Sequence, residues 1–138
     1  MVNRLLHPQE IEVFYVLPAL RKHIAMCMKE QGMKQKDIAE VLQVEGATVS
    51  QYISEKRANK ITFNNALLAE IKQSTVRITN KLSMIREIQH LLRRVRETNT
   101  LCTIHHSISD LPENCTPAEM GCDVGGELGD EARTRICY

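Results

Sequence analysis

Apolar side chains recur every three or four positions between residues 8 and 31, which predicts an amphipathic helix. The apolar positions are Ile11, Phe14, Leu17, Leu20, Ile24 and Met28. Pro8 suits the first turn of such a helix, and Gly32 is a natural stop after its last turn. Pro18 lies inside the pattern, where it removes a backbone hydrogen bond, so we expect either a kink or two helices that meet there.

Two shorter helical patterns follow at residues 35–42 and 47–55, and each is too short to be stable alone. A long amphipathic pattern then runs from Thr62, the expected N-cap, to about residue 98, with no internal Gly or Pro. Its apolar stripe consists of Leu67, Ile71, Ile78, Leu82, Ile85, Leu92 and Val95. The polar run at residues 72–75 interrupts the stripe, so a break in the helix is an alternative.

A continuous helix over residues 63–95 would be about 50 Å long, more than a small core covers from one side. We therefore expect a second copy of the chain to cover its apolar stripe, and the protein to be a homodimer. The alternative is that this segment forms two helices that fold back onto their own chain.

No segment shows the alternation typical of a strand, so the fold class is expected to be all-α. The pattern divides the chain into a first part at residues 1–62, a helical linker or dimerisation segment at residues 63–98, and an irregular tail at residues 99–138. The tail contains Cys, His, Gly and Pro and lacks helical periodicity.

The chain has 138 residues, of which 43% are apolar and 25% charged, so it matches one folded domain with a modest core. This size excludes a large multidomain enzyme. No apolar run approaches the roughly 20 residues that cross a bilayer, and the first residues lack the features of a signal peptide. We expect a cytoplasmic protein without a membrane partner.

The net charge of +1 hides an uneven distribution along the chain. Residues 1–100 carry 16 basic and 10 acidic side chains, whereas residues 101–138 carry 2 basic and 7 acidic ones. A basic body of this kind favours contact with a polyanion.

Residues 35–57 carry the most specific pattern, that of a helix-turn-helix. Ala39 is small enough for the close approach of the two helices. The apolar residues that would hold the second helix on the first are Ile38, Leu42, Val44, Val49 and Ile53.

With those side chains buried, the second helix would present a polar face able to contact base edges or phosphates in a major groove. That face consists of Glu45, Ala47, Thr48, Ser50 and Gln51. Gln51 can form two hydrogen bonds with adenine. Side chains at helix ends and just beyond the second helix are expected to contact phosphates, and these are Gln35, Lys36, Lys56, Arg57 and Lys60.

The sequence here resembles the Cro/repressor-type helix-turn-helix regulators, or XRE family, over residues 33–60. The resemblance lies in Gln35, Ala39, the Leu42 and Val44 pair, the string at residues 49–52, and the basic pair at residues 56 and 57. Such turns often have Gly where this chain has Gln43, which would adopt the turn geometry under some strain.

The order of segments also resembles a subset of archaeal and bacterial regulators with a Cys-rich C-terminal segment. In that subset a segment like residues 15–21 precedes the motif, and a helical linker follows it. The resemblance implies a small, DNA-binding transcriptional regulator with a ligand or cofactor element near its C-terminus, and it does not imply which effector binds.

The tail brings together residues that suit a soft metal, namely Cys102, His105, His106, Cys115 and Cys122. These residues could hold zinc in a closed tetrahedral site, or an iron-sulfur cluster, with Cys137 as a further ligand of the cluster. The third alternative is unligated cysteines that act as thiols. The members of the subset often have C-x-x-C where this chain has Cys102-x-x-His105.

No phosphate-binding Gly loop, nucleophile elbow or H-E-x-x-H motif occurs, so we do not expect an enzyme. The expected function is a homodimeric, sequence-specific transcriptional regulator of double-stranded DNA, whose tail senses redox state, metal or iron-sulfur supply, or a small effector. The alternative is an antitoxin-like DNA-binding module whose tail is a structural zinc site or binds a partner protein.

Overall fold

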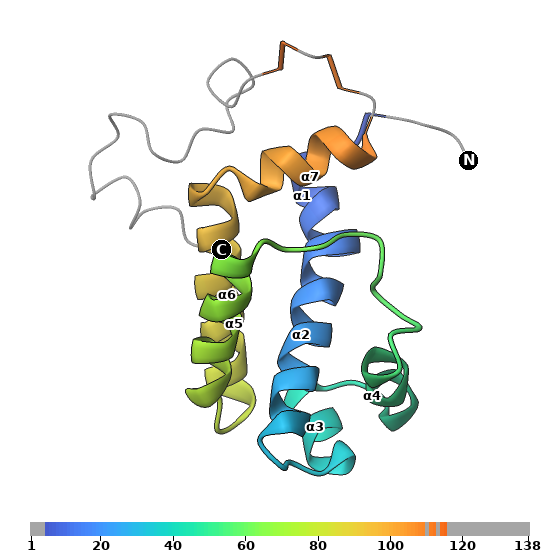
Figure 1. The fold of residues 1–138 in the computed structure, drawn as a ribbon, viewed down its shortest axis with the longest axis vertical. Helices are drawn as coiled ribbons and strands as arrows, with labels where there is room; N and C mark the ends of the chain where they lie inside the picture. Colours follow the sequence, from blue (N-terminus) through green and yellow to red (C-terminus); the bar gives the residue numbers. More distant parts are fainter. Residues whose placement is uncertain (1–4, 110, 113, 116–138) are drawn as a thin grey trace.

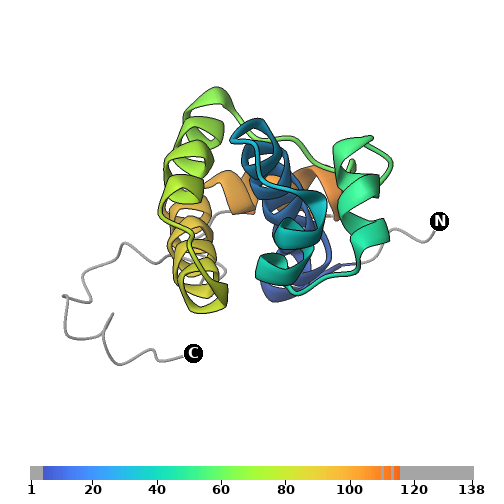
Figure 2. The ribbon, with the colours of Figure 1, turned by 90° about the horizontal axis from the view of Figure 1, so that it is seen from below.

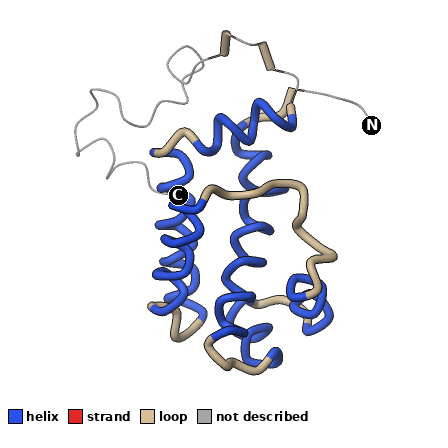
Figure 3. Tube along the Cα trace, viewed as in Figure 1, coloured by secondary structure: helices blue, strands red, loops and turns tan. Residues whose placement is uncertain are grey.

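The computed structural model describes residues 5–109, 111, 112, 114 and 115, and in this part of the chain all regular structure is helical (Figure 3). This confirms the all-α fold class. The helices are α1 (Pro8–Ile11), η1 (Glu12–Val16, a π-helix), α2 (Leu17–Glu30), α3 (Gln35–Leu42), α4 (Gly46–Ile53), α5 (Asn65–Val76), α6 (Lys81–Glu97) and α7 (Thr100–Ile108).

The first three elements, α1, η1 and α2, follow one another as a single column (Figure 1). The junction expected near Pro18 takes the form of a π-turn, in which the Leu17 N–H bonds to the carbonyl of Glu12 instead of that of Val13. Pro18, which has no N–H to donate, comes directly after this π-turn, in the first turn of α2. Gly32 has a φ of 87° and follows the end of the column, as expected.

The segment from α5 to α6 corrects the expectation of one long helix, because it forms a hairpin of two antiparallel helices (Figure 1). The helix α5 begins at Asn65, since the side chain of Asn64, not Thr62, caps it by accepting a hydrogen bond from the N–H of Leu67 at 2.8 Å. The break lies after the polar run, at residues 77–80. Asn80 and Ser83 cap α6 reciprocally, with side-chain to backbone distances of 2.8 and 2.9 Å.

The polar run does not break the helix, because Lys72 and Gln73 are exposed on its outer side and the two hydroxyl residues turn inward. The side chains of Ser74 and Thr75 are buried, and the Thr75 hydroxyl donates to the carbonyl of Ile71 at 2.8 Å. The hairpin buries most of the expected dimer stripe within its own chain, including Leu67, Ile71, Ile78 and Leu92. Only Leu82 and Ile85 remain exposed, by 78% and 48%.

The helix α2 lies at the centre of the fold, between the α5–α6 hairpin and the α3–α4 pair (Figure 2). Aliphatic side chains build the core around it, as the scarcity of aromatic residues implies. The largest fully buried side chains include Ile11, Leu20, Ile24, Met28, Ile38, Leu42, Ile71 and Leu91.

Residues 100–108, which we expected to be irregular, form α7 across the end of the first column and α6 (Figure 1). The ring Nε2 of His105 lies 2.6 Å from the carbonyl oxygen of Leu6, and the Leu6 N–H donates to the Ser109 hydroxyl at 2.9 Å. The C-terminal end of α7 is thus hydrogen-bonded to the segment that precedes α1.

Candidate nucleic-acid interface

The helices α3 and α4 are held on α2 by apolar side chains that point inward from both. Ile38 and Val49 are fully buried, Ala39 is also buried, and α3 packs against α4. Gln43 adopts the left-handed conformation, with a φ of 58° and a ψ of 44°, which confirms the strained turn expected from the sequence. The two helices therefore form a packed pair rather than independent turns.

The outer face of α4 and the residue that caps it are polar and exposed. Glu45, Ala47, Ser50 and Gln51 are exposed, and Thr48 is half-buried. The Ser50 hydroxyl donates to Oε1 of Gln35 at 3.1 Å, which joins the first residue of α3 to the middle of α4. The structure thus brings Gln35 close to the face predicted to contact bases.

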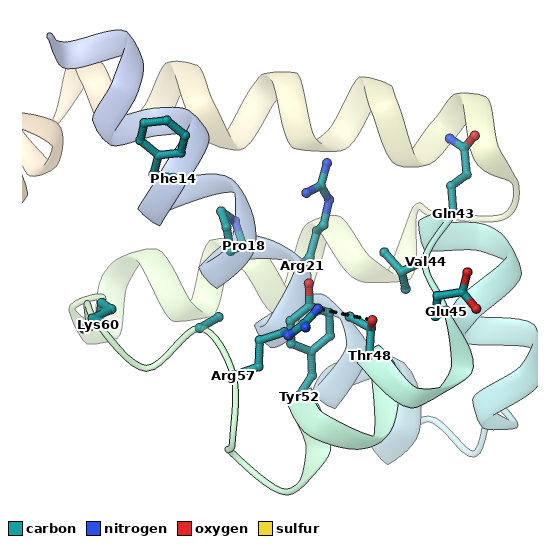
Figure 4. Close-up of a pocket in the computed structure, with 11 residues that line it drawn as sticks. Phe14, Pro18, Arg21, Gln43, Val44, Glu45, Thr48, Tyr52, Arg57 and Lys60 are labelled. Carbon is teal, nitrogen blue, oxygen red and sulfur yellow. Dashed lines mark hydrogen bonds between the residues drawn. The ribbon is translucent and has the colours of Figure 1, made fainter. Parts of the chain in front are cut away.

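The basic residues predicted to contact phosphates lie on α3 and in the loop after α4. Lys36, Lys56, Arg57 and Lys60 are all exposed. Arg57 Nη1 donates to the Thr48 hydroxyl at 3.2 Å, which holds the loop after α4 against that helix (Figure 4). This contact places a guanidinium beside the polar face of α4.

Sequence reasoning missed the residue that supports this loop, Lys22 of α2. It is buried, and its Nζ donates to Oδ1 of Asn59 at 3.0 Å and lies 3.9 Å from the carboxylate of Glu55. Burial and the charge of Lys22 lower the pKa of the neighbouring His23, and the charge of Glu55 opposes that shift. The only sign of this support in the sequence was a lysine within an apolar helix pattern.

A groove of about 730 Å³ runs between α2 and α4, beside the polar face (Figure 4). Its walls come from η1, α2, the turn between α3 and α4, α4 itself and the loop that follows. The residues that line it include Phe14, Pro18, Arg21, Glu45, Thr48, Tyr52, Arg57 and Lys60. Phe14 and Arg21 were not candidates in the sequence, because nothing in the order of residues places η1 and α2 beside α4.

The predicted metal ligands are only partly described. Cys102, His105 and His106 lie on α7, Cys115 follows it, and Cys122 lies outside the described residues. Within the described ranges, no group of three or more His, Cys, Asp or Glu side chains is placed to hold a metal ion. His105 also uses its Nε2 in the contact with Leu6. Zinc or an iron-sulfur cluster in the tail stays a prediction, which metal analysis of the purified protein would test.

Comparisons with family models, with curated proteins and with solved structures find no match for this chain. None of the described helices combines the length and the apolar character that a membrane span needs. Function must therefore be argued from the chain's own geometry.

Proposed function

We propose that this protein is a sequence-specific DNA-binding transcriptional regulator of the helix-turn-helix class, similar to the XRE regulators, and that it acts as a homodimer. The single observation that carries this proposal is the outer face of α4. A short helix, packed on the fold by buried side chains, presents exposed polar groups, and exposed cations lie on α3 and in the loop after α4.

The dimensions of α4 suit a major groove. An α-helix with its side chains is about 10–12 Å in diameter, which fits the roughly 12 Å width of the major groove of B-form DNA, and the eight residues of α4 extend about 12 Å along its axis. Gln51 can form two hydrogen bonds with adenine, and Thr48 and Ser50 can bond to several bases. Lys36 at the start of α3, and Lys56 after α4, would then lie over the phosphates on either side.

A dimer would let the protein read two half-sites about 34 Å apart. The long-helix dimer seam does not exist in this fold, since most of its residues are buried in the monomer. The remaining support for association is the exposed apolar pair Leu82 and Ile85 on α6. Ultracentrifugation over a range of concentrations tests this part of the proposal, with Leu82→Ser combined with Ile85→Ser as the disrupting variant.

The DNA-binding proposal is tested by selecting preferred duplexes from a random pool and measuring affinity against salt concentration. Gln51→Ala should relax the base preference at one position, with a loss of about 1–3 kcal/mol on the preferred site. Lys56→Ala should weaken binding to every duplex and lower the salt slope by about one.

Matched controls are Gln73→Ala and Lys72→Ala, because both residues are exposed on α5, away from α4. If the wild-type protein selects no sequence, or if the controls weaken binding as much as the α4 variants do, the proposal is wrong.

A further inference from the structure

The groove between α2 and α4 has the size and the mixed lining of a site for a small molecule. Its volume of about 730 Å³ lies within the roughly 300–1,000 Å³ typical of ligand sites. Ligand sites combine apolar walls with a few polar groups that fix orientation. Here Pro18, Val44 and Tyr52 provide apolar surface, and the polar groups include three cations, Arg21, Arg57 and Lys60.

The arginines of the groove differ from most others in the described part of the chain. Arg77 and Arg86 pair with Glu87, Arg94 with Glu70 and Glu97, and Arg96 with Glu12.

Arg21 and Arg57, by contrast, form no ion pair with any described residue. The Nε of Arg21 is buried and has no hydrogen-bond partner among the described residues. Neither guanidinium is thus neutralised by a carboxylate, so each keeps a positive charge that an anion in the groove could pair with.

The apolar wall includes an aromatic ring that the fold leaves in water. Phe14 is 57% exposed although it is one of the two phenylalanines in the chain. In Figure 4 its ring lies at one end of the groove, on the same helical column as Pro18 and Arg21. An exposed aromatic ring beside cationic groups suits a ligand with an apolar or planar part and an anionic part.

The charge of the groove favours a doubly charged anion. Arg21, Arg57 and Lys60 contribute three positive charges, and Glu45 contributes one negative charge. A phosphomonoester carries a charge of about −1.5 to −2 at pH 7, which matches the surplus of two positive charges. We infer that this groove binds the phosphomonoester of a small apolar or aromatic molecule.

Such a ligand would compete with DNA, an extension that rests on the proposed function. Arg57 lines the groove and also bonds to Thr48, a member of the polar α4 face. A phosphate on Arg57 would withdraw this guanidinium from a DNA phosphate. The ligand would therefore lower the affinity for DNA and act as an effector.

The test uses phenyl phosphate as the probe, titrated into the isotope-labelled full chain while amide chemical shifts are recorded by NMR. The expected result is saturable shifts at residues that line the groove. Arg21→Gln and Arg57→Gln should each weaken binding about tenfold, as expected for the loss of a charged hydrogen bond. Glu45→Gln should strengthen binding about threefold by removing a like charge.

Two controls separate a built site from general charge attraction. Arg93→Gln removes an exposed positive charge from α6 and should leave the affinity unchanged. Phe14→Ala should lower the affinity for phenyl phosphate but leave the affinity for inorganic phosphate unchanged. Val13→Ala, at an equally exposed position outside the groove lining, should change neither affinity. Absence of saturation, shifts confined to other surfaces, or equal losses in Arg93→Gln and Arg57→Gln would each overturn the inference.

The DNA arm distinguishes this inference from the proposed function. If phenyl phosphate binds in the groove and no duplex is bound, the groove site stands and the proposed function fails. If DNA binds and phenyl phosphate does not bind, the reverse holds. If both bind and the probe leaves the DNA affinity unchanged, the effector role fails and the ligand site stands.

Discussion

Replacement of Gln43 by glycine should stabilise the protein, because this residue closes α3 in a left-handed conformation. Its φ is 58°, and its N–H bonds to the carbonyl of Glu40 at 3.2 Å. The next N–H, of Val44, bonds to the carbonyl of Ala39 at 3.0 Å. The Gln43 side chain is exposed and forms no hydrogen bond to any described residue, so glycine would lose no contact of this kind.

The magnitude follows from two opposing terms. A left-handed conformation costs a non-glycine residue about 1–2 kcal/mol, which Gln43→Gly would recover. Glycine makes the unfolded chain more flexible, which takes back about 0.4–1 kcal/mol. The expected gain in the free energy of unfolding is therefore about 0.5–1 kcal/mol, or a rise in Tm of roughly 2–5 °C.

The assay is urea unfolding followed by circular dichroism, with thermal unfolding as a second measurement. Gln43→Ala keeps a Cβ and should show no gain. Glu40→Gly, in the interior of α3, should lose about 1 kcal/mol, because glycine is a poor helix former. Ala58 also has a positive φ, of 61°, but its side chain packs against the core, so Ala58→Gly should gain less than Gln43→Gly. If Gln43→Gly is as destabilising as Glu40→Gly, the turn does not have the left-handed geometry and the reasoning is refuted.

Three further predictions concern the rest of the fold. Leu20→Ala should cost about 2–5 kcal/mol in urea unfolding, since Leu20 is fully buried, whereas Val76→Ala at a 69% exposed position should change stability by less than about 0.5 kcal/mol. Arg96 and Glu12 form a partly buried ion pair with two hydrogen bonds, of 2.6 and 3.0 Å. Glu12→Gln should therefore lower the free energy of unfolding by about 1–3 kcal/mol. No coupling in a double-mutant cycle with Arg96→Met would contradict this. Burial alone raises the pKa of Glu87, but hydrogen bonds from Arg86 and Arg77 outweigh it and hold the pKa below its ordinary value. The stability that Glu87 contributes is therefore present above its unfolded pKa, near 4.5, and is lost as the pH falls through the folded pKa. Over that range of pH the wild-type protein should lose more stability than Glu87→Gln. Equal pH profiles of the free energy of unfolding for the two proteins would exclude the effect.

The sequence by itself determined the helical class and the helices up to α4, whereas it predicted α5 and α6 as one helix and the α7 segment as irregular. Spacing of three and four residues specifies which side chains share a helix face, and this depends only on local geometry. The bounds of α3, Gln35–Leu42, agree with the pattern at residues 35–42. Strain in the turn at Gln43 was expected only from the family resemblance, because such turns often have glycine at this position. The outward position of Ser50 and Gln51 followed from the burial of Val49 and its neighbours.

Only the tertiary structure decided how these helices pack. A stripe of apolar residues indicates that another surface packs against it, but it does not indicate whether that surface belongs to a second chain or to the next helix. Here reciprocal caps between Asn80 and Ser83 let the chain reverse, so α6 covers α5. A hydroxyl within a helix can also donate a hydrogen bond to a backbone carbonyl of the preceding turn, as Thr75 does, so its burial is compatible with the helix.

The groove depends on tertiary structure for the same reason. Arg21 and Arg57 are 36 positions apart, and only the packing of α4 on α2 brings them to one surface. Helical periodicity carries no information on contacts between distant elements. The sequence could therefore place residues on α4 as candidates for DNA contact, but the groove beside them could not be predicted without the tertiary structure.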